Sequence, residues 1–315
     1  KAVVSLALTV EAVAVVGLTL TWWGDKGFVD ALSEAVFYAI SAFNSAGFVL
    51  SPNGLVDYAS SIPVNLIVSI LFVIGGLGFS VITNIAEKRR WHDFSVYTRA
   101  ILIATLIINV LSVAIIWLLE MNNPATFANL SIGDQAMAAW FQATTPRSAG
   151  FNTVDTGAMT EASAVFTLLL MLIGGGSMST AGGIKLGTFI VLLVATYAFL
   201  RRREHVTLLN RTVPQEIVMK ALAVTLVTLT LMFLGIFILM ILNPLPFIDI
   251  TFEVLSASAT VGLSRGITAD VTAASQVVLV FLMFAGRVGP LTLAYFLATP
   301  RKRHIRFPET DIQVG

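Results

Sequence analysis

The sequence of 315 residues contains no cysteine and only three histidines, and only 12% of its residues are charged. Without cysteine there is no disulfide framework and no thiolate metal site. The histidines (His92, His205 and His304) all lie in basic stretches and none lies in an apolar segment. In contrast, 57% of the residues are hydrophobic and the mean hydropathy is +0.88, which is more apolar surface than a soluble domain needs. The composition therefore indicates an integral membrane protein.

Six apolar segments are long enough to cross the hydrocarbon core of a bilayer. They occupy residues 2–22, 62–86, 98–119, 162–199, 217–242 and 275–298. Lysine and arginine gather in alternate connections, which the positive-inside rule assigns to the cytoplasm. Three of these clusters, here called the basic face, are Lys88–Arg90, Arg201–Arg203 and Arg301–Arg303. The opposite side carries eleven acids, which either form a cation-attracting vestibule or are ordinary solvated loop residues.

One pattern occurs three times on the acidic side of the membrane. The segments 41–48, 144–151 and 256–263 each contain small residues that end in a glycine, namely Gly47, Gly150 and Gly262. These glycines lie 103 and 112 residues apart, so whole helix–loop–helix units repeat. Backbone carbonyls can turn toward an ion where side chains are small and φ is unrestricted. The pattern predicts three segments of a pore filter.

A short apolar segment precedes each of these loops. The segments Phe28–Ala42, Ile132–Ala143 and Phe247–Ser258 are too short to span, and each has an aspartate near its start. We expect re-entrant helices whose negative C-terminal ends point at the pore axis. An interfacial helix is the alternative for any single segment. The predicted fold class is therefore an all-α integral membrane protein of repeated helix–pore-loop–helix units around a central pore.

The second span of each unit contains a glycine-rich interruption, at residues 74–79, 174–183 and 284–290. The middle interruption has five glycines among ten residues, and each glycine costs about 1 kcal/mol of helix propensity. We expect an unwound intramembrane loop that lines a cavity and acts as a gate, movable at small cost because it has no large side chain to pack. The alternative is a close helix-packing surface.

Four of the charged residues within apolar or filter segments bear on the pore. Arg287 either forms an electrostatic barrier and gate latch or a structural salt bridge. Lys185 lies near the inner face and either belongs to the gate or snorkels. Arg147 is expected to point behind the filter toward an acid or carbonyls, and Glu11 either bonds a neighbouring helix or acts directly on ions.

The motifs resemble the Ktr/Trk/HKT superfamily of potassium transporters. The matching segments are SAFNSAGF (41–48), TPRSAGFNT (145–153), GGGSMSTAGGIK (174–185), TVGLS (260–264) and GRVGPLT (286–292). The short loops resemble the bacterial pore-forming KtrB branch more than the longer Trk branch. The resemblance implies four repeats around one pore, of which this sequence contains three. These are residues 1–97, 98–210 and 211–315, corresponding to the second, third and fourth repeats. We expect a first repeat upstream of Lys1.

The pattern and the resemblance together assign two sets of site residues. The ion-binding filter comprises Asn44, Ser45, Ala46, Gly47, Ser148, Ala149, Gly150, Thr260, Val261 and Gly262. The gate comprises Gly174, Gly175, Gly176, Ser177, Ser179, Thr180, Gly182, Gly183, Lys185 and Arg287.

The resemblance also implies potassium uptake in the bacterial inner membrane. It implies K⁺ as the bound ion, with Na⁺ open as a coupling or activating ion, and no organic cofactor. The implied partners are membrane lipid, a second copy in a homodimer and a cytoplasmic nucleotide-binding ring of the KtrA type, without nucleic acid. Alternatives are a Trk-like or HKT-like sodium/potassium transporter and an unrelated secondary carrier. A membrane enzyme would need an intramembrane catalytic set that the sequence lacks.

Overall fold

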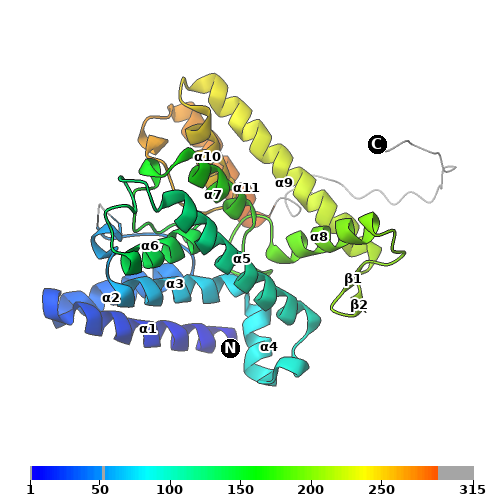
Figure 1. Ribbon diagram of the computed structural model, residues 1–315, viewed down its shortest axis with the longest axis horizontal. Coiled ribbons are helices and arrows are strands. Elements are labelled where there is room, and N and C mark those ends of the chain that lie inside the picture. The colour runs from blue at the N-terminus through cyan, green and yellow to red at the C-terminus, as the bar shows by residue number, and fades with distance from the viewer. Residues whose placement is uncertain (1, 52–53, 290–315) are drawn as a thin grey trace.

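The computed structural model describes residues 2–51 and 54–289. The end of the sixth predicted span, the motif residues 290–292 and the cluster Arg301–Arg303 lie outside the described residues. Within the described part, eleven α-helices make up three consecutive units, which Figure 1 shows in order from blue through green to orange.

Each unit begins with a long helix, continues with a short one and ends with a helix that is bent, interrupted or short. The first unit contains α1 (Ala2–Lys26), α2 (Phe28–Phe43), α3 (Ile62–Leu77) and α4 (Phe79–Lys88). The second contains α5 (Val96–Glu120), α6 (Ile132–Thr144), α7 (Glu161–Leu172) and α8 (Leu186–Leu200). The third contains α9 (Gln215–Leu242), α10 (Phe247–Ser258) and α11 (Ala273–Val288), and the hairpin β1 (Thr207–Leu208) and β2 (Arg211–Thr212) precedes it. Short 3₁₀ turns lie at Val56–Tyr58, Trp91–Asp93, Thr156–Ala158 and Ile267–Ala269.

The short helices α2, α6 and α10 coincide with the predicted re-entrant segments to within a residue at each end. Local capping explains this agreement. Ser131 accepts a hydrogen bond from the Asp134 amide (3.2 Å) at the start of α6, and Pro246 immediately precedes α10. The same type of cap begins α5, α7 and α11, where Ser95, Thr160 and Thr272 accept from the backbone amide three residues on.

Three of the predicted spans are single helices long and apolar enough to cross a membrane, namely α1, α5 and α9. The span predicted over 62–86 is not straight, because α3 and α4 meet at 94°. The bend lies at Gly78, whose φ of 93° a residue with a side chain rarely adopts. The span predicted over 162–199 is divided into α7 and α8 by the non-helical residues 173–185, as the glycine content predicted.

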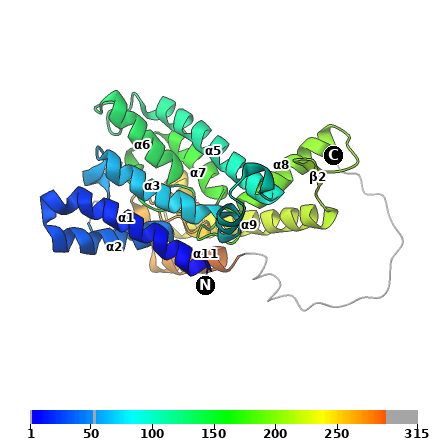
Figure 2. The same cartoon turned by 90° about the horizontal axis from the view of Figure 1, so that it is seen from below.

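The helices pack through small residues. The face of α2 that contacts α1 and α3 presents Ala31, Ala35, Ala39 and Ala42, all fully buried. Figure 2 shows these three helices side by side. Large apolar side chains such as Val13, Val16 and Leu20 are instead exposed on the outer surface of α1. This inverted distribution is typical of helices that face lipid and pack on one another through small side chains.

Candidate ion pathway

The three predicted filter segments begin where the short helices end. Residues two positions before each key glycine have positive φ: Ser45 (51°), Ser148 (80°) and Thr260 (50°). The glycines also have positive φ, at 69° for Gly47, 77° for Gly150 and 94° for Gly262. Each loop therefore contains two left-handed residues separated by one residue. Non-glycine residues in this region are uncommon, so the same exception in all three loops identifies one repeated backbone shape.

The three glycines converge although they are far apart in the sequence. A Cβ atom added to Gly150 would lie 3.2 Å from the Gly47 Cα, 3.5 Å from the Gly262 Cα and 2.5 Å from the Val261 carbonyl oxygen. A Cβ added to Gly47 would lie 2.9 Å from the carbonyl oxygen of Ala149. The carbonyl before one glycine therefore lies against the glycine of the preceding unit. Only residues without side chains allow the backbones to approach this closely.

Between the first and third units the filter segments line an open cavity of about 520 Å³. Its walls include Asn44 and Ala46 on one side and Val261 and Gly262 on the other. The first and third filter segments thus lie on either side of this cavity, whereas Gly150 of the second segment lies against both Gly47 and Gly262. The Thr260 carbonyl, which belongs to the predicted filter, accepts a hydrogen bond from the Ser148 hydroxyl (3.0 Å).

Hydroxyl groups behind the filter segments were not predicted. Ser41 donates to the Phe48 carbonyl (3.0 Å), Thr145 donates to the Phe151 carbonyl (2.6 Å), and the Ser256 hydroxyl accepts from the Gly262 amide (3.2 Å). Each hydroxyl is buried and lies at the C-terminal end of one of the short helices α2, α6 and α10. A Ser or Thr recurs five or six positions before each key glycine, and this repetition in the sequence could have indicated the three hydroxyl groups.

Two charged residues near the filter have side-chain amides as partners. The Asn44 amide donates to a Glu11 carboxylate oxygen (3.2 Å), which ties α1 to the first filter segment. Glu11 therefore bonds a neighbouring element, and that element is the filter itself. Arg147 donates to the Asn109 amide oxygen (3.0 Å) on α5, so its guanidinium points behind the filter as predicted. The amide oxygen takes the place of the acid or backbone carbonyl that was expected.

The interrupted segment 173–185 forms a loop directly beneath the filter. The hydroxyls of Ser45 and Thr180 lie 2.9 Å apart, and the Gly182 amide donates to the Ser148 hydroxyl (2.9 Å). Ser45 and Ser148 have positive φ in the first and second filter segments, and their hydroxyl groups bond these two segments to the loop.

The other limb of the loop is held by backbone hydrogen bonds. The Gly176 amide donates to the Gly76 carbonyl (2.8 Å), and the Gly174 amide donates to the Ile184 carbonyl (2.9 Å). A Cβ atom on Gly174 or Gly176 would overlap a neighbouring backbone carbonyl. The expectation that the loop moves at small cost considered only its lack of large side chains and did not include these contacts. Backbone bonds and close glycine contacts hold it instead.

Arg287 extends from α11 to this loop and donates to the Thr180 carbonyl (2.5 Å). The same residue lines both the cavity beside the filter and a cavity of about 280 Å³ below the loop. Lys185 also lines the lower cavity, but its ammonium group bonds the Ala181 carbonyl of the same loop. This contact favours the assignment of Lys185 to the gate over the alternative that its side chain snorkels to the interface.

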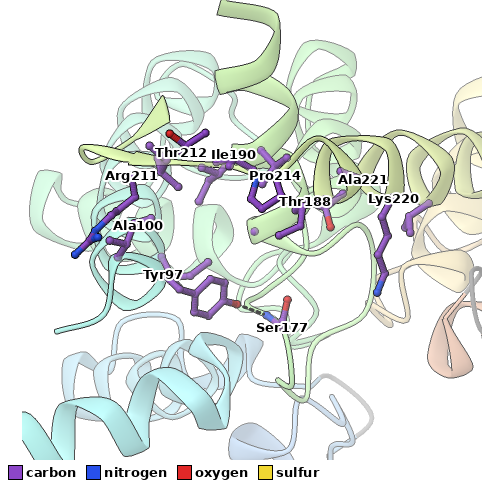
Figure 3. Close-up of a pocket in the computed structure, with 18 residues that line it drawn as sticks. Tyr97, Ala100, Ser177, Thr188, Ile190, Arg211, Thr212, Pro214, Lys220 and Ala221 are labelled. Atoms are coloured by element: carbon purple, nitrogen blue, oxygen red, sulfur yellow. Dashed lines mark hydrogen bonds between the residues drawn. The ribbon is translucent and has the colours of Figure 1, made fainter. Parts of the chain in front are cut away.

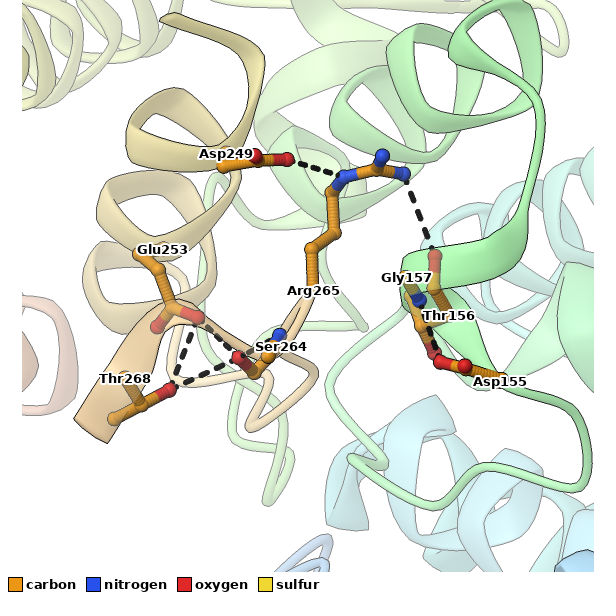
Figure 4. A network of polar contacts seen from close by, with 9 residues as sticks. Asp155, Thr156, Gly157, Asp249, Glu253, Ser264, Arg265 and Thr268 are labelled. Carbon is orange, nitrogen blue, oxygen red and sulfur yellow. Dashed lines mark hydrogen bonds and ion pairs between the residues drawn. The ribbon is translucent and has the colours of Figure 1, made fainter. Parts of the chain in front are cut away.

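Several of the predicted outer acids have structural partners. Arg265 pairs with Asp249 on α10 (2.7 Å) and donates to the Thr156 carbonyl of the second unit (3.4 Å) (Figure 4). Glu253, one turn further along α10, accepts from the hydroxyls of Ser264 and Thr268.

Glu120 is fully buried at the end of α5. Its carboxylate accepts from Asn123, Thr126 and both the amide and the hydroxyl of Thr160. This acid therefore joins α5 to the start of α7 rather than lining a vestibule. Within residues 2–51 and 54–289, no group of three or more His, Asp or Glu side chains is placed to hold a metal ion.

The arrangement is that of a multi-pass membrane protein in which re-entrant helices bring repeated backbone loops to one axis, above an intramembrane loop. Comparison with known proteins identifies the family. The family described as "TrkH: Cation transport protein" matches residues 1–304, and the chain belongs to this family.

Named relatives cover the whole chain. It is 42% identical to the Ktr system potassium uptake protein B of Bacillus subtilis, over 100% of this chain and 71% of that protein. It is 39% identical to the protein of the same name from Vibrio alginolyticus, over 100% and 70%. The potassium/sodium uptake protein NtpJ of Enterococcus hirae is 30% identical, over 99% and 71%.

A solved structure has the same fold. The crystal structure of the potassium transporter TrkH from Vibrio parahaemolyticus superimposes with a TM-score of 0.81 at 21% sequence identity. The match covers 95% of this chain and 64% of that chain, so this chain spans less than two thirds of that protein.

Proposed function

We propose that this chain supplies filter segments and the gate of a channel-like transporter that takes up potassium across the bacterial plasma membrane. The names of the relatives, which describe potassium uptake and potassium transport, support this proposal. It assigns the protein to transport rather than to enzymatic catalysis.

The convergence of Gly47, Gly150 and Gly262 carries the proposal. Their repeated left-handed backbone and lack of side chains allow carbonyl oxygens to replace the hydration shell of an ion. The C-terminal ends of α2, α6 and α10 add negative potential at the same depth. A fourth filter segment would occupy the cavity of about 520 Å³ between the first and third units and complete the ring.

The gate in this proposal is the loop 173–185 together with Arg287. The guanidinium lies between the cavity beside the filter and the cavity below the loop, where it both bonds a loop carbonyl and repels a passing cation. Lys185 adds a second positive charge to the lower cavity. Opening requires the loop to leave its backbone partners, and a free-energy source that favours the open state would promote it.

That source in our proposal is a nucleotide-binding ring of the KtrA type bound to the basic face of a homodimer. The name of the Enterococcus hirae relative, potassium/sodium uptake protein, keeps open a role for Na⁺ as coupling ion or as substrate.

Gly262→Ser tests the filter. Gly262 has only the Gly150 Cα within reach of an added Cβ (3.5 Å), so the variant is expected to fold while its side chain enters the filter. We expect the complete transporter to lose selectivity for K⁺ over Na⁺ in uptake assays in a potassium-uptake-deficient strain. Gly266→Ser is the matched control, because Gly266 also has positive φ (100°) but open space around it. Unchanged selectivity with serine at Gly47, Gly150 and Gly262 in turn would contradict the filter assignment.

A further inference from the structure

A cavity of about 420 Å³ lies away from the filter, where α5 and α9 begin (Figure 3). The first turns of α5, α8 and α9 and the hairpin β1–β2 form its walls. Its volume is within the range of about 300–1,000 Å³ typical of small-molecule pockets. Most of the lining is apolar and includes Ala100, Ile101, Ile190, Val191, Ile217 and Val224.

Two basic side chains, Arg211 and Lys220, line the cavity on different sides (Figure 3). Both are exposed, and neither forms an ion pair or a side-chain hydrogen bond with any residue in the described part of the chain. The hydroxyl-bearing residues Thr188 and Thr212 also line it. The cavity thus combines an apolar interior with two positive charges that have no acidic partner.

Its depth in the membrane follows from the topology. The spanning helices α5 and α9 both begin at this cavity, directly after the connections that carry Lys88–Arg90 and Arg201–Arg203 of the basic face. The cavity therefore lies at the level of the lipid headgroups of the cytoplasmic leaflet. Anionic headgroups collect at this surface, and basic pockets between membrane helices on this side suit them.

We propose that this cavity binds an anionic phospholipid of the cytoplasmic leaflet. The negative headgroup is attracted by the two positive charges of Arg211 and Lys220, and part of an acyl chain lies against the apolar walls. Charge complementarity and the headgroup depth select this occupant over a neutral lipid or a soluble anion.

The cavity is connected to the loop beneath the filter. Tyr97 lines the cavity, and its hydroxyl accepts a hydrogen bond from the Ser177 amide (2.8 Å), the contact drawn in Figure 3. Next to Ser177, the Met178 carbonyl accepts from the Phe79 amide (3.2 Å) at the start of α4. A lipid in the cavity therefore stabilises the position of Tyr97 and with it one limb of the loop. This second step rests on the proposed function of the loop as a gate.

Lipid binding is tested on the complete, delipidated transporter by native mass spectrometry with phosphatidylglycerol and with phosphatidylcholine of the same acyl chains. The test variant is Arg211→Gln with Lys220→Gln. The matched control is Arg201→Gln with Arg202→Gln, which removes two charges from the same face outside the cavity. Each basic residue contributes about fivefold to binding an anionic headgroup, so we expect about 30-fold weaker phosphatidylglycerol binding in the test variant alone.

Four results would overturn the lipid site. Three of them are equal binding of the two lipids by the unmodified protein, an equal loss in both double variants, and no loss in the test variant. The fourth is that Arg211 and Lys220 are needed for binding the regulatory ring but not for binding lipid, which would assign the cavity to a protein partner.

The connection to the loop is tested by Tyr97→Phe, which removes the hydroxyl and keeps the ring. We expect unchanged phosphatidylglycerol binding but a loss of the dependence of K⁺ flux on phosphatidylglycerol content in liposomes. Tyr197→Phe, on α8 outside the cavity, should retain that dependence. If Tyr97→Phe retains it as well, the connection is refuted while the lipid site stands. If no preparation conducts K⁺, the proposed function fails, and the binding measurement still decides the lipid site.

Discussion

Replacing Arg287 by alanine removes the guanidinium that holds the Thr180 carbonyl at 2.5 Å. A hydrogen bond to a charged group contributes about 1.5–3 kcal/mol, so loss of this bond shifts the gate equilibrium about 10- to 160-fold toward the open loop. If the closed loop is favoured about 100 to 1, the open fraction rises from about 1% to between about 10% and 60%. We therefore expect K⁺ flux to rise by at least about tenfold and to depend less on the regulatory ring.

The assay is K⁺ flux into liposomes that contain equal amounts of folded transporter, checked by size-exclusion chromatography. Arg287→Lys separates the two effects of the guanidinium, because lysine keeps the charge but lacks the planar fork of donors. Arg202→Ala, measured in the absence of the regulatory ring, is the control for the loss of a positive charge from the cytoplasmic side. Unchanged or lower flux in well-folded Arg287→Ala would refute the latch and make the loop a packing element.

Further predictions concern packing, burial and assembly. Gly176→Ala should strongly destabilise the protein in thermal unfolding, because its Cβ would overlap the Leu77 carbonyl, whereas Gly76→Ala, with open space around it, should not. Glu120→Gln should lower the free energy of unfolding by about 1–3 kcal/mol, since the buried carboxylate accepts four hydrogen bonds, and the exposed Glu87→Gln should be neutral by the same measurement. Charge reversal of the basic face should abolish co-purification of the regulatory ring without unfolding the protein, and unaltered co-purification would rule out that contact surface.

The elements were predictable from the sequence because their signals are local. The short helices begin where a polar, glycine or proline residue precedes an apolar segment, as at Ser131 and Pro246. The loop 173–185 was predictable for the same reason, since five glycines cannot maintain a helix without large cost. The interruption at 74–79 was predicted from its glycines, but the angle of 94° at Gly78 was not, because glycine permits a bend without fixing its size.

The sequence by itself determined the class of the protein and the positions of the short helices and of most spans, because spans and turns depend on neighbouring residues. Only the tertiary structure decided the long-range partners. Arg147 bonds Asn109 rather than an acid, Lys185 turns back to its own loop, and the loop is held by backbone groups instead of being free. Some of these contacts join residues that are distant in the sequence, and others end on backbone carbonyls, which every residue has. In both cases the partner is determined only when the helices pack. The physical reason is that hydrogen-bond partners are chosen by proximity in the folded chain, which residue type alone does not encode.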